Sequence, residues 1–194
     1  MTKDEIKAIA VSYFGKHGYE GTSLSDIAKE VGIKKPSIYN HFTGKDELFL
    51  CVFEEVVWET VRQIEGTMKK TSHLSIEDRL YHILNTIFEY FMYHEEKSNF
   101  IKRSIMFPPE HLKVIIKEKF FLSEEPLSCI LRTLFTEGIE TGVIRRAKVE
   151  DLVVAYYCLL DGLFMHLSYY AKDGVALQVQ NVWKNFLTGI INNS

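Results

Sequence analysis

Apolar residues recur along this chain every three to four positions, the spacing of an α-helix, and this periodicity constrains the fold more than any other feature. The stretch 80–91 shows it clearly, with apolar side chains at Leu80, Ile83, Leu84, Ile87, Phe88 and Phe91. No stretch alternates apolar and polar residues as a half-buried strand does. Only four prolines occur, and most glycines fall between the periodic stretches. We therefore predict an all-α fold of about nine to ten helices.

Capping residues locate the ends of several helices. Ser23-x-x-Asp26 is a capping box that opens a short helix, and Gly32 ends it. Thr43-x-x-Asp46 is expected to open a long helix in the same way. The first helix is expected to close at Gly15 and Gly18, and the others to cover about 24–31, 35–41, 45–69, 75–95, 98–106, 109–121, 124–141, 149–171 and 175–191.

A polar stretch at 69–72 divides the chain into two parts. We expect a three-helix head at 1–45, a connecting helix at 45–69, and a larger helical body within 46–194. Residues 1–48 have seven lysines and seven acids, so the formal charge of this segment is zero, and the whole chain carries −3. Any binding of nucleic acid must therefore come from a few placed contacts and not from a broad basic field.

Composition limits the location and chemistry of the protein. No apolar run reaches the roughly 18–20 residues that span a bilayer, and the N-terminus does not resemble a signal peptide, so we expect a cytoplasmic protein. Cys51, Cys129 and Cys158 lie far apart among apolar neighbours and are expected to be buried free thiols. We expect no disulfide, no metal and no cofactor.

Residues 24–42 have the layout of a helix-turn-helix, two short helices joined by a tight turn at a glycine. Apolar positions pack this pair against the first helix and direct Ile38 and Phe42 inward. The polar residues of the second helix then lie on its free face, where they suit phosphates and base edges of a major groove. A solvated polar helix in any helical bundle would show the same spacing.

Three runs of residues in and around this helix-turn-helix resemble a known protein family. The runs GYEGTSLSDIA at 18–28, GIKKPSIYNHF at 32–42 and KDEL at 45–48 closely resemble the DNA-binding head of the tetracycline-repressor (TetR) family. The resemblance covers about residues 6–50. It implies a homodimer that binds a pseudo-palindromic double-stranded operator, with a divergent body that binds a ligand and forms the dimer.

The resemblance also assigns roles to single residues. It implies that Thr22, Tyr39 and Lys45 hold phosphates, whereas Lys35, Ser37, Asn40 and His41 face the groove. Lys34 stands where the family commonly has Ser or Thr, so the recognition helix loses a side-chain cap worth about 1 kcal/mol. Pro36 partly offsets this loss because its ring sets the backbone angle of the first helical turn. With Ser23 at the start of the preceding helix, the expected DNA-binding set is Thr22, Ser23, Lys34, Lys35, Pro36, Ser37, Tyr39, Asn40, His41 and Lys45.

The first helix begins almost at Met1, so we expect readout in the major groove alone. The stretch 149–171 is apolar nearly all round and must be covered on nearly all sides, and 124–141 has a complementary apolar stripe. The family pairs through its eighth and ninth helices, and these two stretches take those places in the predicted order. A buried core helix of a monomer would show the same pattern. The expected interface residues are Leu127, Ile130, Leu131, Leu134, Phe135, Leu160, Leu163 and Leu167.

The resemblance implies a pocket for a small apolar or aromatic ligand, and the body is rich in aromatic residues. Asp161 and His166 lie in the most apolar stretch, where a buried charge is costly unless it is paired. They are expected to satisfy each other, a neighbour or a ligand. The candidate ligand-binding residues are Tyr90, His94, Arg103, Phe107, His111, Phe121, Tyr157, Asp161, Phe164 and His166.

These patterns predict a transcription regulator, a repressor that a small molecule releases from its operator. The alternative is a DNA-binding regulator or architectural protein that a partner controls. An enzyme is not expected, because the sequence has no nucleophile motif and no phosphate-binding glycine loop. The run His94-Glu95-Glu96-Lys97 also lacks the second histidine of a zinc-protease helix.

Overall fold

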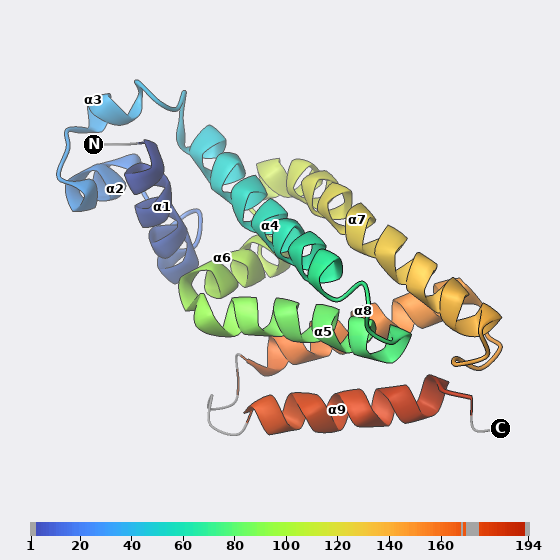
Figure 1. Cartoon of the computed structure of the whole chain (residues 1–194). Helices are drawn as coiled ribbons and strands as arrows, with labels where there is room; N and C mark the ends of the chain where they lie inside the picture. Colours follow the sequence, from blue (N-terminus) through green and yellow to red (C-terminus); the bar gives the residue numbers. More distant parts are fainter. Residues whose placement is uncertain (1–2, 168, 170–174, 193–194) are drawn as a thin grey trace. The chain divides into compact units, whose positions relative to one another are not determined.

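The computed structural model describes residues 3–167, 169 and 175–192. Within them the chain forms nine α-helices and one 3₁₀-helix (Figure 1), which confirms the predicted all-α fold. In the same residues, β pairing is limited to an isolated bridge between Ile144 and Ile191. The helices are α1 (Lys3–His17), α2 (Leu24–Val31), α3 (Lys35–Ile38), α4 (Lys45–Lys70), α5 (Ile76–Tyr93), α6 (Glu95–Met106), η1 (Glu110–Leu112), α7 (Lys113–Glu140), α8 (Val149–His166) and α9 (Val175–Ile190).

The helices group into two compact units. Unit 1 comprises Met1–Glu59 and His94–Ser123, and unit 2 comprises Thr60–Tyr93 and Glu124–Ser194. Helices α4 and α7 contribute residues to both units. Unit 1 therefore joins the expected three-helix head to α6, η1 and the first part of α7, which the predicted division assigns to the body. None of the described helices is long and apolar enough to cross a membrane.

In unit 1, α1 packs against both α2 and α6, and α2 packs against α3. Gly15 permits the close approach of α6, because a Cβ atom at this position would lie 3.1 Å from the carbonyl oxygen of Glu96. Beside it the rings of Phe14, Phe49 and Phe100 meet at centroid distances of 4.9–6.2 Å. These rings are all buried, so α1, α4 and α6 share one aromatic core.

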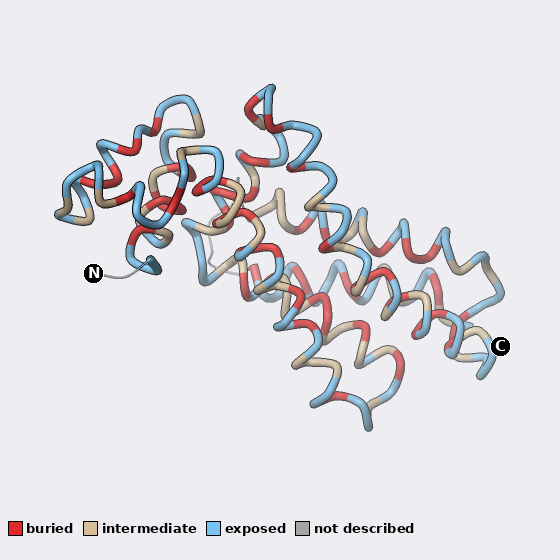
Figure 2. The backbone as a smooth tube through the Cα atoms, turned by 90° about the horizontal axis from the view of Figure 1, so that it is seen from above, coloured by how far each residue is buried: buried red, intermediate tan, exposed pale blue. Residues whose placement is uncertain are grey.

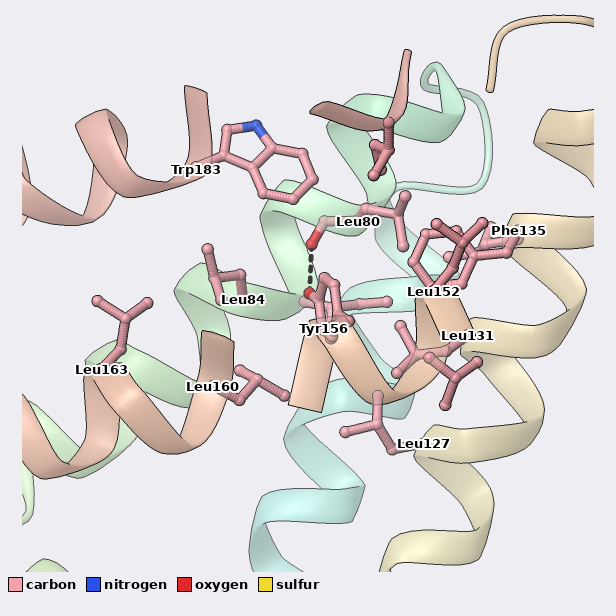
Figure 3. Close-up of a cluster of buried hydrophobic side chains, with 14 of the residues drawn as sticks. Leu80, Leu84, Leu127, Leu131, Phe135, Leu152, Tyr156, Leu160, Leu163 and Trp183 are labelled. Carbon is pink, nitrogen blue, oxygen red and sulfur yellow. Dashed lines mark hydrogen bonds between the residues drawn. The ribbon is translucent and has the colours of Figure 1, made fainter. Parts of the chain in front are cut away.

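In unit 2, α5 packs against α8 and α9, and buried residues of α5, α7, α8 and α9 form one core. Tyr156 is fully buried and its hydroxyl donates a hydrogen bond of 2.7 Å to the carbonyl oxygen of Leu80 (Figure 3). Buried and exposed positions alternate along the helices with the period of amphipathic helices (Figure 2). The predicted apolar stripes therefore face this core.

One predicted boundary is wrong. The separate helices expected at 109–121 and 124–141 form a single helix, α7, with Pro126 inside it. A proline within a helix removes a backbone hydrogen bond and costs about 3 kcal/mol. Here buried residues of α7 lie on both sides of it, with Ile116 and Ser123 before it and Leu127 and Leu131 after it, so packing maintains the helix.

The ends of α3 and α8 differ from their predicted positions by fewer residues. Helix α3 has four residues, and Tyr39–His41 form a turn after it instead of completing the expected helix to residue 41. Helix α8 ends at His166, and residues 170 and 171 of the predicted end lie outside the described residues. Because α7 is continuous, the eighth and ninth α-helices are 149–166 and 175–190, not the two stretches that the sequence order assigned to those places.

Candidate nucleic-acid interface

Helices α2 and α3 form the predicted helix-turn-helix, with local sequence signals at each end of α2. The Ser23 hydroxyl accepts a hydrogen bond from the Asp26 backbone N–H, and the Asp26 carboxylate accepts one from the Ser23 N–H, so the capping box is present. The pKa of Asp26 is lowered by the Ser23 hydroxyl and backbone N–H. Gly32 ends α2 at a φ of 79°, a left-handed conformation that favours glycine.

Helix α3 is anchored by its apolar side and presents its polar side to solvent. Ile38 is fully buried and Phe42 nearly so, as predicted, whereas the Tyr39 side chain is 50% exposed. Lys34 precedes the helix without a side-chain cap, and Pro36 lies in the first turn. The other polar members of the set are also accessible: Lys34, Lys35, Pro36, Asn40 and His41 are exposed, and Ser37 is half-buried.

Thr22 does not have the accessible hydroxyl that a phosphate contact requires. Its side chain is 1% exposed. Its hydroxyl donates to the carbonyl oxygens of Gly18 at 2.8 Å and Tyr13 at 3.1 Å. A hydroxyl has one proton, and these two carbonyl oxygens share it, so no proton remains to donate to a phosphate. The Thr22 side chain instead fixes the turn before α2. We therefore leave Thr22 out of the candidate phosphate contacts and keep Ser23, which is exposed.

Lys45 lies at the start of α4 and holds the turn between α1 and α2. Its ammonium donates to the carbonyl oxygens of Tyr19 at 2.9 Å and Thr22 at 3.1 Å. It also lies 3.9 Å from the centroid of the Tyr19 ring, a cation–π contact. An ammonium has three protons, so one remains to donate to a phosphate.

The cap of α4 differs from the expected capping box. The backbone N–H and hydroxyl of Thr43 both donate to the Glu47 carboxylate, and not to Asp46. Asp46 instead accepts from the hydroxyl of Tyr19, and His111 Nε2 lies 3.3 Å from its Oδ2. Asp46 is therefore a tertiary contact residue. Sequence spacing alone does not distinguish these two carboxylates, because both lie in the first turn.

The ten candidate ligand residues divide between the two units. His94, Arg103, Phe107, His111 and Phe121 belong to unit 1, and all five are exposed. The other five belong to unit 2. There, Phe164 contacts Phe91 at a centroid distance of 4.6 Å. It lines a cavity of about 10 Å³ with Ile87, Phe88, Phe91, Leu160, Leu163 and Leu167.

Two of the unit 2 candidates, Asp161 and His166, were expected to be buried polar groups that satisfy each other, a neighbour or a ligand. Asp161 is instead exposed, and partial desolvation raises its pKa. His166 Nε2 lies 2.6 Å from the Gln178 side-chain oxygen, so its partner comes from α9. The Tyr157 hydroxyl donates to the carbonyl oxygen of Glu124 at 3.1 Å and lies 2.9 Å from the Ser128 hydroxyl.

The expected dimer residues belong to the core of their own subunit. Figure 3 shows several of them, from α7 and α8, in the buried cluster around Tyr156. The buried ones are thus covered by their own chain in this packing. The buried members are Leu127, Leu131, Leu134, Phe135, Leu160 and Leu163, and Ile130 and Leu167 are partly buried against them.

The exposed side of α8 has a different apolar set from the residues expected at the interface. Val154, Ala155, Cys158 and Gly162 are all exposed, with Val154 at 60%. Cys129 on α7 is exposed as well, and Cys51 is half-buried, so the expectation of three buried thiols is wrong. In a helix apolar nearly all round, periodicity does not show which side the subunit covers.

Known proteins resemble this chain in sequence and fold. Residues 6–52 match the family "Bacterial regulatory proteins, tetR family". The biofilm operon icaADBC HTH-type negative transcriptional regulator IcaR of Staphylococcus aureus (strain Newman) is 28% identical over 194 residues, covering 98% of this chain and 97% of that protein. The IcaR of Staphylococcus epidermidis is 47% identical over 47 residues, covering 24% of this chain and 25% of that protein.

Two solved structures show the likeness in fold. The fatty acid degradation regulator FadR from Bacillus halodurans has a TM-score of 0.77 and 21% identity, covering 95% of this chain and 93% of that one. FadR from Bacillus subtilis, in complex with stearoyl-CoA, has a TM-score of 0.76 and 20% identity, covering 97% of this chain and 100% of that one. The exposed helix-turn-helix thus lies within residues 6–52, which match the tetR family of bacterial regulatory proteins, and the whole chain is similar to these solved regulators in its all-α fold.

Proposed function

We propose that this protein is a homodimeric transcription repressor that binds operator DNA through α2 and α3 and leaves it when a small molecule binds. The observation that carries the proposal is the polar face of residues 34–41, which is exposed to solvent on a helix anchored by buried Ile38. The relative from Staphylococcus aureus is named a negative transcriptional regulator, which supports repression. Because the operator is chromosomal DNA, we place the protein in the cytoplasm.

The two sides of the interface have different tasks. Lys35, Ser37, Asn40 and His41 would read base edges in the major groove, where a side-chain amide can form two hydrogen bonds with adenine. Phosphates would be held by Tyr39, Ser23 and the remaining proton of the Lys45 ammonium, and Lys34 adds a charge next to the backbone. These contacts position the helix without reading sequence.

A dimer is required to place two such helices on one operator. The exposed apolar side of α8, with Val154, Ala155, Cys158 and Gly162, supports α8 as its centre. A Cβ atom on Gly162 would meet nothing within 4 Å in its own subunit, so a second backbone has room to approach there. Leu177 on α9 is 61% exposed and would extend this surface to the ninth helix. Half-sites one turn apart would then be about 34–36 Å apart.

Release by a small apolar or aromatic ligand is supported by the likeness to FadR, whose structure contains stearoyl-CoA. The cavity at Phe91 and Phe164 has room for about one water, so a ligand there would have to open it. Such a ligand acts only if it binds more tightly to the conformation that does not fit the operator. This couples the body to the head without any contact between ligand and DNA.

Control by a protein partner is the second candidate, and one observation favours it. Unit 1 exposes several large apolar side chains at the end of α6 and the start of α7. Phe107 is 80% exposed, and exposed apolar patches of this kind often mark interaction sites. The others are Met106, Val114, Phe121 and Leu122.

Selection of bound sites from random duplexes, using the full chain, tests the proposal. The expected product is an inverted repeat, and transcription from a promoter that contains it should fall when the protein is added. Acyl-CoA of graded chain length is then added to the complex of protein and selected DNA. If a small ligand controls the repressor, it should release the protein from this DNA. Failure to enrich any sequence would contradict the DNA-binding function, and enrichment without release by small molecules would favour the partner.

A further inference from the structure

His111, in the short helix between α6 and α7, contacts two residues of the helix-turn-helix region. Its Nε2 atom lies 3.3 Å from the Asp46 carboxylate in the first turn of α4. Its ring meets the Tyr19 ring in a T-shaped arrangement at a centroid distance of 5.4 Å. All three residues belong to unit 1, so this cluster lies within one compact body.

The partners of His111 also hold the turn that leads into α2. Tyr19 donates its hydroxyl to Asp46, and its carbonyl oxygen accepts from Lys45. The carbonyl oxygen of Thr22 accepts from the same ammonium. The turn 18–23 is thus tied to α4 by Tyr19 and Lys45, and to η1 by His111.

The negative charge of the Asp46 carboxylate strengthens the contacts of this cluster. The pKa of Asp46 is lowered by the Tyr19 hydroxyl, and His111 and Lys45 act in the same direction. The carboxylate is therefore ionised and accepts from donors on two segments, and hydrogen bonds to a charged group are the stronger kind. His111 supplies one of these donors from outside the helix-turn-helix.

The same segment is attached to the head a second time, at its other end. The Ser12 hydroxyl donates to the Glu96 carboxylate at 2.7 Å, and α6 lies close against Gly15 of α1. Glu95–Leu112 therefore joins the head through the start of α6 and through His111. A displacement of this segment would reach both α1 and the turn before α2.

We propose that His111 is a positioning residue for DNA binding, one that fixes Tyr19 and Asp46 and through them the start of α2 and the Lys45 ammonium. The proposal rests on the DNA-binding function stated above. His111 touches no DNA, so its loss weakens operator and random duplexes by the same factor. The His111 and Asp46 side chains are both about half exposed, so losing this contact should weaken binding about two- to fivefold.

A double-mutant cycle and hydrogen exchange test this role with the full chain. The variants are His111→Ala, Asp46→Ala, the double variant, and His111→Gln, whose amide can still donate to Asp46. His73→Ala is the matched control, an exposed histidine of unit 2. Exchange is followed at the backbone amides of Thr22 and Asp26, which donate to the Tyr19 carbonyl and the Ser23 hydroxyl.

The expected results are specific to the cluster. His111→Ala should speed exchange at both amides and weaken DNA binding, His111→Gln should restore part of each, and His73→Ala should change neither. Asp46→Ala should cost less in the His111→Ala background than in the wild type, because only its contact with Tyr19 is then left to lose. Unchanged exchange in His111→Ala would overturn the contact itself, whether or not the protein binds DNA. Faster exchange with unchanged DNA affinity, or additive effects of the two substitutions, would overturn the positioning role.

Discussion

Replacing Gly15 with alanine tests the close packing of α1 against α6. The new Cβ atom would lie 3.1 Å from the carbonyl oxygen of Glu96 and 3.2 Å from the backbone nitrogen of Phe100. Both are backbone atoms, so relief requires α6 to move by a few tenths of an ångström. No flexible side chain is available to yield instead.

The magnitude follows from two opposing effects. Alanine in a helix interior is favoured over glycine by about 1 kcal/mol. Overpacking a close contact costs about 1–3 kcal/mol. We expect Gly15→Ala to lower the free energy of unfolding by about 1 kcal/mol. Gly66→Ala in α4 is the matched control, because its Cβ atom would meet nothing within 4 Å, and it should raise stability by up to about 1 kcal/mol.

Urea unfolding followed by circular dichroism measures both variants. Equal m-values would show that the two free energies can be compared. Because α1 packs against both α6 and α2, a displacement at Gly15 would reach the helix-turn-helix. Gly15→Ala should therefore also weaken operator binding, whereas Gly66→Ala should not. A Gly15→Ala protein stabilised as much as Gly66→Ala would refute the close packing of α1 against α6.

Three further predictions concern charge and assembly. With about 3–4 phosphates neutralised per subunit, the log–log salt slope of operator binding should be about −5 to −7, and a slope steeper than −10 would reveal a basic surface that this account lacks. Burial, and then the charge of Asp161, raise the pKa of Glu124 to about 7 from an ordinary value of 4.5, so the folded state holds this proton more tightly. Stability should therefore fall as pH rises from about 4.5 through 7, by about 1–2 kcal/mol after allowance for partial exposure, and Glu124→Gln should abolish this part of the pH dependence measured by thermal unfolding. Val154→Glu or Gly162→Leu on the exposed side of α8 should yield folded monomers in sedimentation, and a dimer of unchanged affinity would place the interface elsewhere.

The helix-turn-helix could be predicted closely because its signals are local. The capping box at Ser23, the left-handed Gly32 and the inward Ile38 each act within a few residues of the chain, and all three are observed. The missing cap at Lys34 is observed as well. Local chemistry of this kind is readable from one sequence.

The errors have a common physical origin in tertiary packing. Pro126 was expected to lie in a helix that starts at 124, but burial on both sides extends that helix back to Lys113. Asp46 was expected to cap α4, but Tyr19 and His111 engage it. Each outcome depends on which distant element lies opposite, and a helical period does not contain that information.

The dimer surface proposed on α8 could not be predicted for the same reason. Leu134 and Leu163 have the apolar spacing of an interface, yet both are buried in their own subunit. Replacing them with glutamate would therefore unfold the subunit before it separated a dimer. The small residues on the outer side of α8 carry a weaker pattern, and only the structure shows that they are uncovered.

The central claim is that the exposed face of residues 34–41 reads DNA, and one titration tests it most directly. Wild type, Asn40→Ala and Tyr39→Phe are each titrated against the selected operator and a scrambled duplex at two salt concentrations. Asn40→Ala should lose about 1–3 kcal/mol per half-site on the operator alone, because a base contact exists only on the right sequence. Tyr39→Phe should weaken both duplexes by similar factors, because phosphates are the same at every site. Equal weakening of both duplexes by Asn40→Ala, with relaxed sequence preference in Tyr39→Phe, would contradict the assignment.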